Sequence, residues 1–225
     1  MDYLYILGIL FGLYLIFWPI WRFIFAVKIP YRGNKYVVTG IAGGSSKTTL
    51  AEALVNSPQD VYGQMHDTKL HHVRIDDCKY KPDWSRFTKE EFKHNVWREI
   101  LNEGHNRWVV DGLFSDYFTK DPEGTQLDLM KQLCESADYV IRIDLPFIVT
   151  IWRKAFRSFK RRFGCAKQGA GKESWHNVKM MIKNTFIRYD FYKRTLDKEW
   201  KELREKQTET RYIHIKWPYY PVVKK

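Results

Sequence analysis

The sequence predicts an α/β fold with a parallel sheet, helices on both faces of that sheet, and one membrane-spanning helix in front of it. Short runs of strand type alternate with longer helical runs from residue 35 onward, which is the pattern of a parallel sheet covered on both faces. The first of these runs ends in glycine, and a helix-forming run follows it. Residues 3–21, "YLYILGILFGLYLIFWPIW", carry no charge over 19 positions, which is enough to cross a bilayer.

Five short runs, bounded by polar or turn-forming residues, are expected to form strands. They are "KYVVTG" at 35–40, "HHVRIDD" at 71–77, "RWVVDG" at 107–112, "DYVIRIDLP" at 138–146 and "RYIHIKW" at 211–217. Helices are expected at 48–55, ended by "NSP", and within 85–104, where Phe92, Val96 and Ile100 share one face. A long basic helical region spans 147–206 and is interrupted by a Gly-rich stretch at 164–174.

The uncharged segment at 3–21 is expected to be a retained anchor. The alternatives are a buried core helix and a cleaved signal peptide, but the segment follows Asp2 and is crowded with aromatic residues, unlike a signal peptide. Basic residues follow the span, namely Arg22, Lys28, Arg32 and Lys35, which predicts a single-pass membrane protein with its C-terminal domain in the cytoplasm. The predicted division is an anchor at 1–27, a juxtamembrane linker at 28–35, a globular domain at 36–217 and a tail at 218–225.

The net charge of +12 is concentrated in one region of the chain. Residues 151–206 hold 17 Lys and Arg against 6 Asp and Glu, a surplus of 11. This surplus suits nucleotide phosphates, an anionic membrane surface or nucleic acid, and charge alone does not choose among them. The three cysteines, Cys78, Cys134 and Cys165, are too widely spaced to indicate a zinc site or a disulfide framework and are expected to be reduced.

The stretch "GIAGGSSKTT" has the composition of a phosphate-binding loop between a strand and a helix. Its expected nucleotide contacts are Gly43, Gly44, Ser45, Ser46, Lys47, Thr48 and Thr49, with the lysine on the outer phosphates and the Thr48 hydroxyl on magnesium. The spacing departs from G-x-x-x-x-G-K-[ST], because Ser46 replaces the glycine before the lysine and Gly40 lies one residue too far upstream. Ser46 is therefore expected in a backbone conformation that glycine reaches more cheaply.

Two aspartates close predicted strands, where doubly wound folds bind ligands. Asp111 is expected to hold magnesium together with Thr48, and Asp76 to orient the acceptor of a phosphoryl group. For each of them alone, a helix cap or a turn is the competing interpretation. Asp144 also ends a strand, but Pro146 follows shortly after it, so a structural turn is expected there.

The basic helical region carries a regular row of arginines. Arg153, Arg157 and Arg161 share a helix face, and a closing segment at 153–175 would bring them over the phosphates. A solvated basic face and a face apposed to anionic lipid are the alternatives. The aromatic residues Trp175, Phe186, Tyr189 and Trp200 fall at apolar helical positions and are expected in the core, which argues against a nucleic-acid partner.

The order of these motifs resembles the topology modulation protein family, which is related to adenylate kinase. The resemblance covers residues 36–217 and rests on "VRIDDCKYKPDW", "RWVVDG", "ADYVIRIDLP" and "WRKAFRSFKRRFG". It matches Asp76, Tyr80, Pro82 and Trp84 to the Asp, aromatic and Pro-x-Trp run of that family, and Asp111 and Gly112 to its strand-end Asp-Gly pair.

The resemblance implies a three-layer P-loop nucleoside/nucleotide kinase-like fold with a five-stranded parallel sheet, ATP and Mg²⁺ at the loop, and an Arg-bearing lid. The irregular loop, the absence of an arginine shortly after Asp-Gly and the added N-terminal span depart from the family pattern. The expected function is transfer of the γ-phosphoryl group of ATP to a nucleoside, nucleotide or other small acceptor at a membrane. The alternative is a catalytically impaired nucleotide-binding or scaffold protein whose basic surface meets anionic lipid or nucleic acid.

Overall fold

The computed structural model describes the chain from residue 26 to residue 223 with several gaps. The described residues are 26–29, 33–40, 46–56, 60–61, 64–65, 70–79, 81, 85, 87–102, 106–112, 125–162, 175–206, 209–216 and 220–223. The predicted membrane span at 3–21 lies outside them. Among the residues that the structure describes, none of the helices combines the length and the apolar character of a membrane span.

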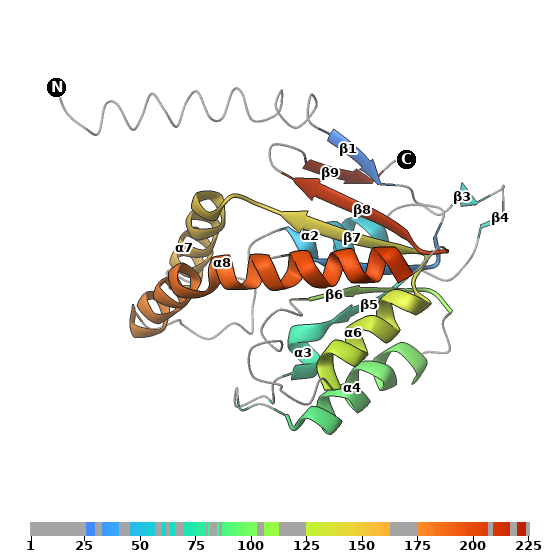
Figure 1. The fold of residues 1–225 in the computed structure, drawn as a ribbon, viewed down its shortest axis with the longest axis horizontal. Coiled ribbons are helices and arrows are strands. Elements are labelled where there is room, and N and C mark those ends of the chain that lie inside the picture. The colour runs from blue at the N-terminus through green and yellow to red at the C-terminus, as the bar shows by residue number, and fades with distance from the viewer. Residues whose placement is uncertain are drawn as a thin grey trace.

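A five-stranded parallel sheet forms the centre of the fold (Figure 1). Its strands, in spatial order, are β5 (His71–Arg74), β6 (Trp108–Asp111), β2 (Lys35–Thr39), β7 (Tyr139–Asp144) and β8 (Arg211–Lys216). These are the five predicted strands, although β5 is shorter than expected. The chain continues from it into a short helix, α3 (Ile75–Lys79), at Ile75.

Helices cover both faces of this sheet. The remaining helices are α2 (Lys47–Val55), α4 (Lys89–Asn102), α6 (Thr125–Ser136), α7 (Phe147–Arg162) and α8 (Trp175–Lys206). Figure 1 shows α8 crossing one face while α2 lies behind the sheet. The predicted three layers, with a parallel sheet between helices, are therefore present.

Alternation along the strands divides the core into two clusters, because successive strand side chains point to opposite faces. Val37 of β2 packs with apolar residues of α4, α6 and α8, whereas its neighbour Val38 packs with Leu50 and Leu54 of α2. The predicted apolar face of α4 is buried as expected, with Phe92, Val96 and Ile100 in the first cluster. Cys78 and Cys134 are buried free thiols, and Cys165 lies outside the described residues.

Local signals account for the start of α4 and the end of α2. Thr88 and Glu91 form a reciprocal capping box at the start of α4, where the backbone N–H of Glu91 donates to the Thr88 hydroxyl and the N–H of Thr88 donates to the Glu91 carboxylate. The backbone N–H of Asn56 bonds to the carbonyl of Glu52 at the end of α2. The helix therefore stops where "NSP" predicts.

Two further strands pair outside the main sheet. β1 (Ala26–Ile29) runs parallel to β9 (Tyr220–Val223), and Figure 1 shows the pair beside β8. Ile29 is fully buried against the α2 side of the core. Parts of the predicted linker at 28–35 and of the predicted tail at 218–225 are thus strands. A two-residue ladder, β3 (Asp60–Val61) with β4 (Gln64–Met65), completes the described elements.

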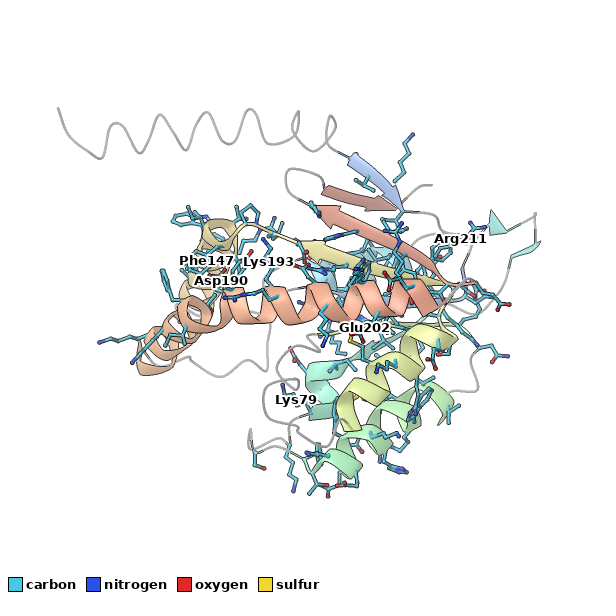
Figure 2. All side chains as sticks on the ribbon, in the orientation of Figure 1. Lys79, Phe147, Asp190, Lys193, Glu202 and Arg211 are labelled. Atoms are coloured by element: carbon cyan, nitrogen blue, oxygen red, sulfur yellow. The ribbon has the colours of Figure 1, made fainter. Side chains whose placement is uncertain are left out.

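α7 and the N-terminal part of α8 extend beyond the sheet as an arm (Figure 1). Phe147 lies at their junction, where Figure 2 shows it beside α8, and its ring contacts the rings of Phe186 and Tyr189. The ammonium of Lys154 also donates a 2.7 Å hydrogen bond to Thr185. Tyr189 and Trp200 are buried as predicted, but Phe186 is 58% exposed, so its assignment to the core is wrong. The side chain of Trp175 lies outside the described residues.

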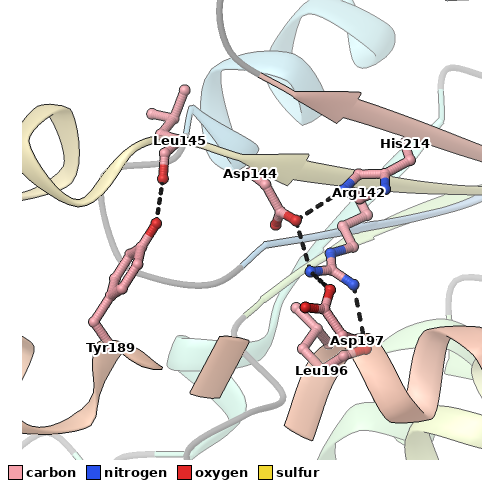
Figure 3. A network of polar contacts seen from close by, with 7 residues as sticks. All are labelled: Arg142, Asp144, Leu145, Tyr189, Leu196, Asp197 and His214. Carbon is pink, nitrogen blue, oxygen red and sulfur yellow. Dashed lines mark hydrogen bonds and ion pairs between the residues drawn. The ribbon is translucent and has the colours of Figure 1, made fainter. Parts of the chain in front are cut away.

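An ion-pair network around the buried Arg142 fixes α8 on the sheet (Figure 3). The Arg142 guanidinium of β7 lies 2.6 Å from carboxylate oxygens of both Asp144 and Asp197. His214 Nε2 lies 2.7 Å from Asp144, and the Tyr189 hydroxyl donates a 2.6 Å hydrogen bond to the Leu145 carbonyl. Burial raises the pKa of Asp144, but bonds from His214 and Arg142 outweigh burial, so that pKa lies below its ordinary value. Asp144 therefore has the structural role expected of it, within a network rather than a turn.

Candidate functional site

The loop after β2 leaves the sheet where the strand order reverses. β2 lies between β6 and β7, and the chain passes from β2 toward β5 but from β7 toward β8. Carboxyl ends of strands that diverge in this way flank the crevice in which open parallel sheets bind ligands. The predicted phosphate loop starts there. Its members Gly43, Gly44 and Ser45 lie outside the described residues, and Ser46, Lys47, Thr48 and Thr49 lie within them.

Ser46 has a left-handed backbone immediately before α2. Its φ is 65° and its ψ is 17°, and it is the single non-glycine residue with positive φ in the described part of the chain. Its carbonyl accepts the first helical hydrogen bond from the N–H of Leu50 at 3.0 Å. The prediction that Ser46 takes a conformation favoured by glycine is confirmed.

Lys47 and Thr48 open α2 beside the end of β6. Val38 of β2 is in register with Asp111 of β6, so the start of the following helix lies close to that aspartate. The Thr48 hydroxyl donates a 2.6 Å hydrogen bond to Asp111 Oδ2. Lys47 is buried, and its charge acts on Asp111. The residue pair predicted to hold magnesium is therefore in direct contact, next to the predicted phosphate-binding lysine.

His72 is a member of this cluster that the sequence analysis missed. Its Nε2 lies 3.0 Å from Asp111 Oδ1, so both carboxylate oxygens of Asp111 have a partner. Burial raises the pKa of Asp111, but the hydrogen bonds from His72 and Thr48 and the charges of His72 and Lys47 outweigh it. The pKa of Asp111 therefore lies below its ordinary value, and this side chain is a carboxylate at neutral pH.

Arg153 connects the arm to the loop. It lies in the second turn of α7, and its guanidinium donates a hydrogen bond to the Ser46 hydroxyl, 107 positions earlier in the chain. The structure therefore brings the first of the three predicted lid arginines to the predicted loop. Arg157 and Arg161 belong to the same helix, but their side chains, like residues 163–174 of the predicted lid, lie outside the described part.

Asp76 lies at the same edge of the sheet as Asp111. Arg74 is in register with Asp111, and the chain turns into α3 directly afterwards. The prediction that Asp76 lies at a strand end is wrong, because β5 ends at Arg74 and Asp76 lies in the first turn of α3. Its side chain is exposed to solvent. Among the described residues, the side-chain hydrogen bonds of Asp111 join it to Thr48 and His72 and not to Asp76.

The glycine after Asp111 makes close packing at this edge possible. A Cβ atom at Gly112 would lie 2.4 Å from the Ile75 Cβ, a distance at which one of the two segments must move. The Gly112 N–H donates to the Val38 carbonyl at 3.2 Å, which ties the end of β6 to β2. The Asp-Gly pair therefore combines the carboxylate that Thr48 and His72 contact with a position where only glycine fits.

The cluster suits an anionic ligand with magnesium. The hydroxyl of Thr48 and the carboxylate of Asp111 are hard oxygen donors, and magnesium completes its shell with waters and phosphate oxygens. In the parts of the chain that are described, no three His, Cys, Asp or Glu side chains group as a self-sufficient metal site.

The comparisons with known proteins add no family assignment. No protein-family model matches the chain, and no curated protein matches it. The resemblance to topology modulation proteins stays a prediction.

Proposed function

We propose that this protein binds ATP with magnesium at the loop between β2 and α2 and transfers the γ-phosphoryl group to a small acceptor. The observation that carries the proposal is the 2.6 Å hydrogen bond between Thr48 and Asp111 beside the buried Lys47. In P-loop enzymes a Thr or Ser hydroxyl and a strand-end Asp hold magnesium next to the lysine that binds the outer phosphates. The same three residue types are adjacent here, at the switch point of a parallel sheet.

Each described side chain has a defined part in this proposal. Lys47 binds the β and γ phosphates, while the backbone N–H groups at the start of α2 add the positive end of the helix dipole. Arg153 lies at the loop already, so its charge is available to the transferring group, with Arg157 and Arg161 following on the same helix. Thr48 and Asp111 would hold the metal, which neutralises charge on the phosphates when bound.

The acceptor would enter at the edge next to α3. Asp76 is exposed there, two residues after the register partner of Asp111, which suits a carboxylate that orients an acceptor hydroxyl. We propose a nucleoside, a nucleotide or another small molecule with a hydroxyl or phosphate as the acceptor. We further propose that residues 3–21 tether the domain to a membrane, with the domain on the cytoplasmic side.

A nucleotide-binding protein without phosphoryl transfer is the second candidate. It is favoured by the two hydrogen bonds on Asp111, because Thr48 and His72 already engage both carboxylate oxygens that the metal would need. The backbone of Ser46 also favours this candidate. A serine with positive φ is strained, and the loop would carry that strain in every conformation in which Ser46 stays left-handed.

Nucleotide binding is tested by thermal unfolding of the full chain in detergent, with and without ATP and magnesium. A ligand at about 100 times its Kd stabilises the folded state by about 2.7 kcal/mol, which gives a measurable rise in Tm. The rise should disappear in Lys47→Ala and persist in Lys198→Ala, which removes an exposed lysine of α8. An equal rise in both variants would exclude the loop as the site.

Turnover separates the two candidates. Release of ADP from ATP is measured against a panel of nucleosides, nucleotides and small alcohols. Acceptor-dependent turnover that is lost in Asp76→Asn supports the kinase proposal. Binding by the thermal assay without turnover for any acceptor favours the non-catalytic candidate.

A further inference from the structure

The arm formed by α7 and α8 has an exposed apolar stripe that the proposed nucleotide site does not use. Ile148, Trp152 and Phe156 of α7 are 78%, 71% and 51% exposed. They recur every four residues and therefore lie along one face of the helix. The described residues include six exposed large apolar side chains. Five of them lie on α7 and α8, namely these three and, on α8, Phe186 and Ile187. Exposed apolar residues gathered in this way mark an interaction surface.

The stripe faces away from the body of the protein. Phe147 and Thr150, which lie on other sides of α7, face α8 and the interior: Phe147 contacts Phe186, and Thr150 is 1% exposed. Arg153 follows Trp152 by one residue, which is about 100° around a helix of 3.6 residues per turn. The contact between Arg153 and Ser46 and the exposure of Trp152 therefore occur on different sides of the same helix.

The charge of α7 identifies the kind of partner. The helix contains six Lys and Arg and no Asp or Glu among its 16 residues. An amphipathic helix with large apolar side chains on one face and basic residues elsewhere is typical of helices that lie in the interface of an anionic bilayer. Trp in particular is enriched at the membrane interface, where its ring is partly dehydrated. A second copy of the chain would instead bring two such cationic helices together.

We propose that α7 is an interfacial membrane helix whose Ile148–Trp152–Phe156 stripe inserts among the headgroups of an anionic lipid bilayer. The basic residues of α7 and α8 add attraction to the negatively charged surface. Because Arg153 points elsewhere, the helix can meet the membrane and the phosphate loop at the same time. This proposal rests on exposure and charge, so it stands whether or not the loop binds ATP.

The test reads out contact at α7 itself, so that other membrane contacts of the chain do not interfere. The full chain is reconstituted into vesicles of phosphatidylcholine, with or without phosphatidylserine, that contain a trace of a photoactivatable phospholipid. Lipid-modified peptides are then mapped by mass spectrometry. Peptides covering residues 148–156 should be modified in the phosphatidylserine vesicles, and raising the salt should weaken the signal.

Two substitutions at the stripe and one control make the test specific. Trp152→Ser should reduce modification of this segment by about tenfold, the effect of losing one large apolar side chain, and Ile148→Ser should also reduce it. Leu101→Ser, which removes an exposed apolar side chain of α4, should leave it unchanged. Both stripe residues are exposed, so unfolding curves should confirm that the variants fold.

Three results would overturn the proposal. One is no lipid modification at residues 148–156 in either kind of vesicle. Another is equal modification in the wild type and Trp152→Ser. The third is a self-associated chain in analytical ultracentrifugation that dissociates in Trp152→Ser, because a second copy would then cover the stripe.

Discussion

Thr48 at the start of α2 and Asp111 at the end of β6 are joined by a 2.6 Å hydrogen bond across 63 positions of sequence. The contact depends on the parallel pairing of β2 with β6, which sets Val38 beside Asp111 and directs the helix after β2 toward the same sheet edge. The hydroxyl and the carboxylate therefore meet at the sheet edge where open parallel sheets generally bind ligands.

The first prediction concerns the metal dependence of nucleotide binding. Asp111→Asn keeps an acceptor for the Thr48 hydroxyl but removes the negative charge that would hold magnesium. We expect the ATP-induced rise in Tm to become independent of magnesium in this variant. Asp77→Asn, which alters an exposed carboxylate of α3, should keep the magnesium dependence of the wild type. An unchanged magnesium dependence in Asp111→Asn would remove Asp111 from the proposed metal site.

The second prediction separates backbone strain from side-chain contact at Ser46. Ser46→Gly and Ser46→Ala both remove the hydroxyl that accepts a hydrogen bond from Arg153, but glycine alone adopts positive φ without strain. In urea unfolding, Ser46→Gly should therefore be more stable than Ser46→Ala by about 1 kcal/mol. Equal stability of the two variants would mean that the left-handed conformation carries no cost.

The third prediction concerns the packing of Gly112 on Ile75. Gly112→Ala places a methyl group 2.4 Å from the Ile75 Cβ and should lower the free energy of unfolding by about 1–3 kcal/mol, the usual cost of overpacking. The cost should be smaller in the background of Ile75→Gly, which removes the Cβ and both γ-carbons that the new methyl group would meet. Simple additivity of the two changes in a double-mutant cycle would contradict a direct clash.

The fourth prediction is a pH dependence that originates at Asp144. Its pKa in the folded protein lies below the unfolded value of about 3.9, so the carboxylate adds stability above that pH and loses it as the pH falls through the folded pKa. Asp144→Asn should cost about 3 kcal/mol at neutral pH, because the buried Arg142 loses a partner.

The difference between wild type and Asp144→Asn should shrink as the solution is acidified below pH 4. Asp190→Asn, which neutralises an exposed carboxylate of α8, is the matched control. It should leave the loss of stability below pH 4 as it is in the wild type. A constant difference from neutral to acid pH would show that the effect of Asp144 is one of packing and not of charge.

The main sheet was predictable because its signals are local. Each of β2, β6 and β7 is a short buried run, and polar or turn-forming residues bound it in the chain itself. The position of Ser46 before a helix also required a glycine-like backbone, which the structure confirms. The sequence also predicts Lys47, Thr48 and Asp111 as site residues. A strand followed by a helix and a strand that ends in Asp-Gly can both be recognised from consecutive residues.

Other features depend on which strands are neighbours. His72 reaches Asp111 because β5 pairs with β6, an order that the sequence does not state, and a histidine within a strand is no signal by itself. β1 and β9 are short segments from distant parts of the chain, and neither predicts a strand until the other lies beside it. Ile148 and Trp152 occupy apolar helical positions, which indicate a buried face unless α7 extends beyond the sheet.

The sequence by itself determined the alternation of strands and helices, the identity of the loop residues and the concentration of positive charge, because composition and periodicity act over a few residues. The tertiary structure decided which residues of these elements come into contact. It joined Thr48 to Asp111, brought Arg153 to Ser46 and left Trp152 exposed on a different side of that helix. These contacts follow from strand order and helix packing. Both depend on interactions between residues far apart in the chain, so a local sequence pattern does not predict them.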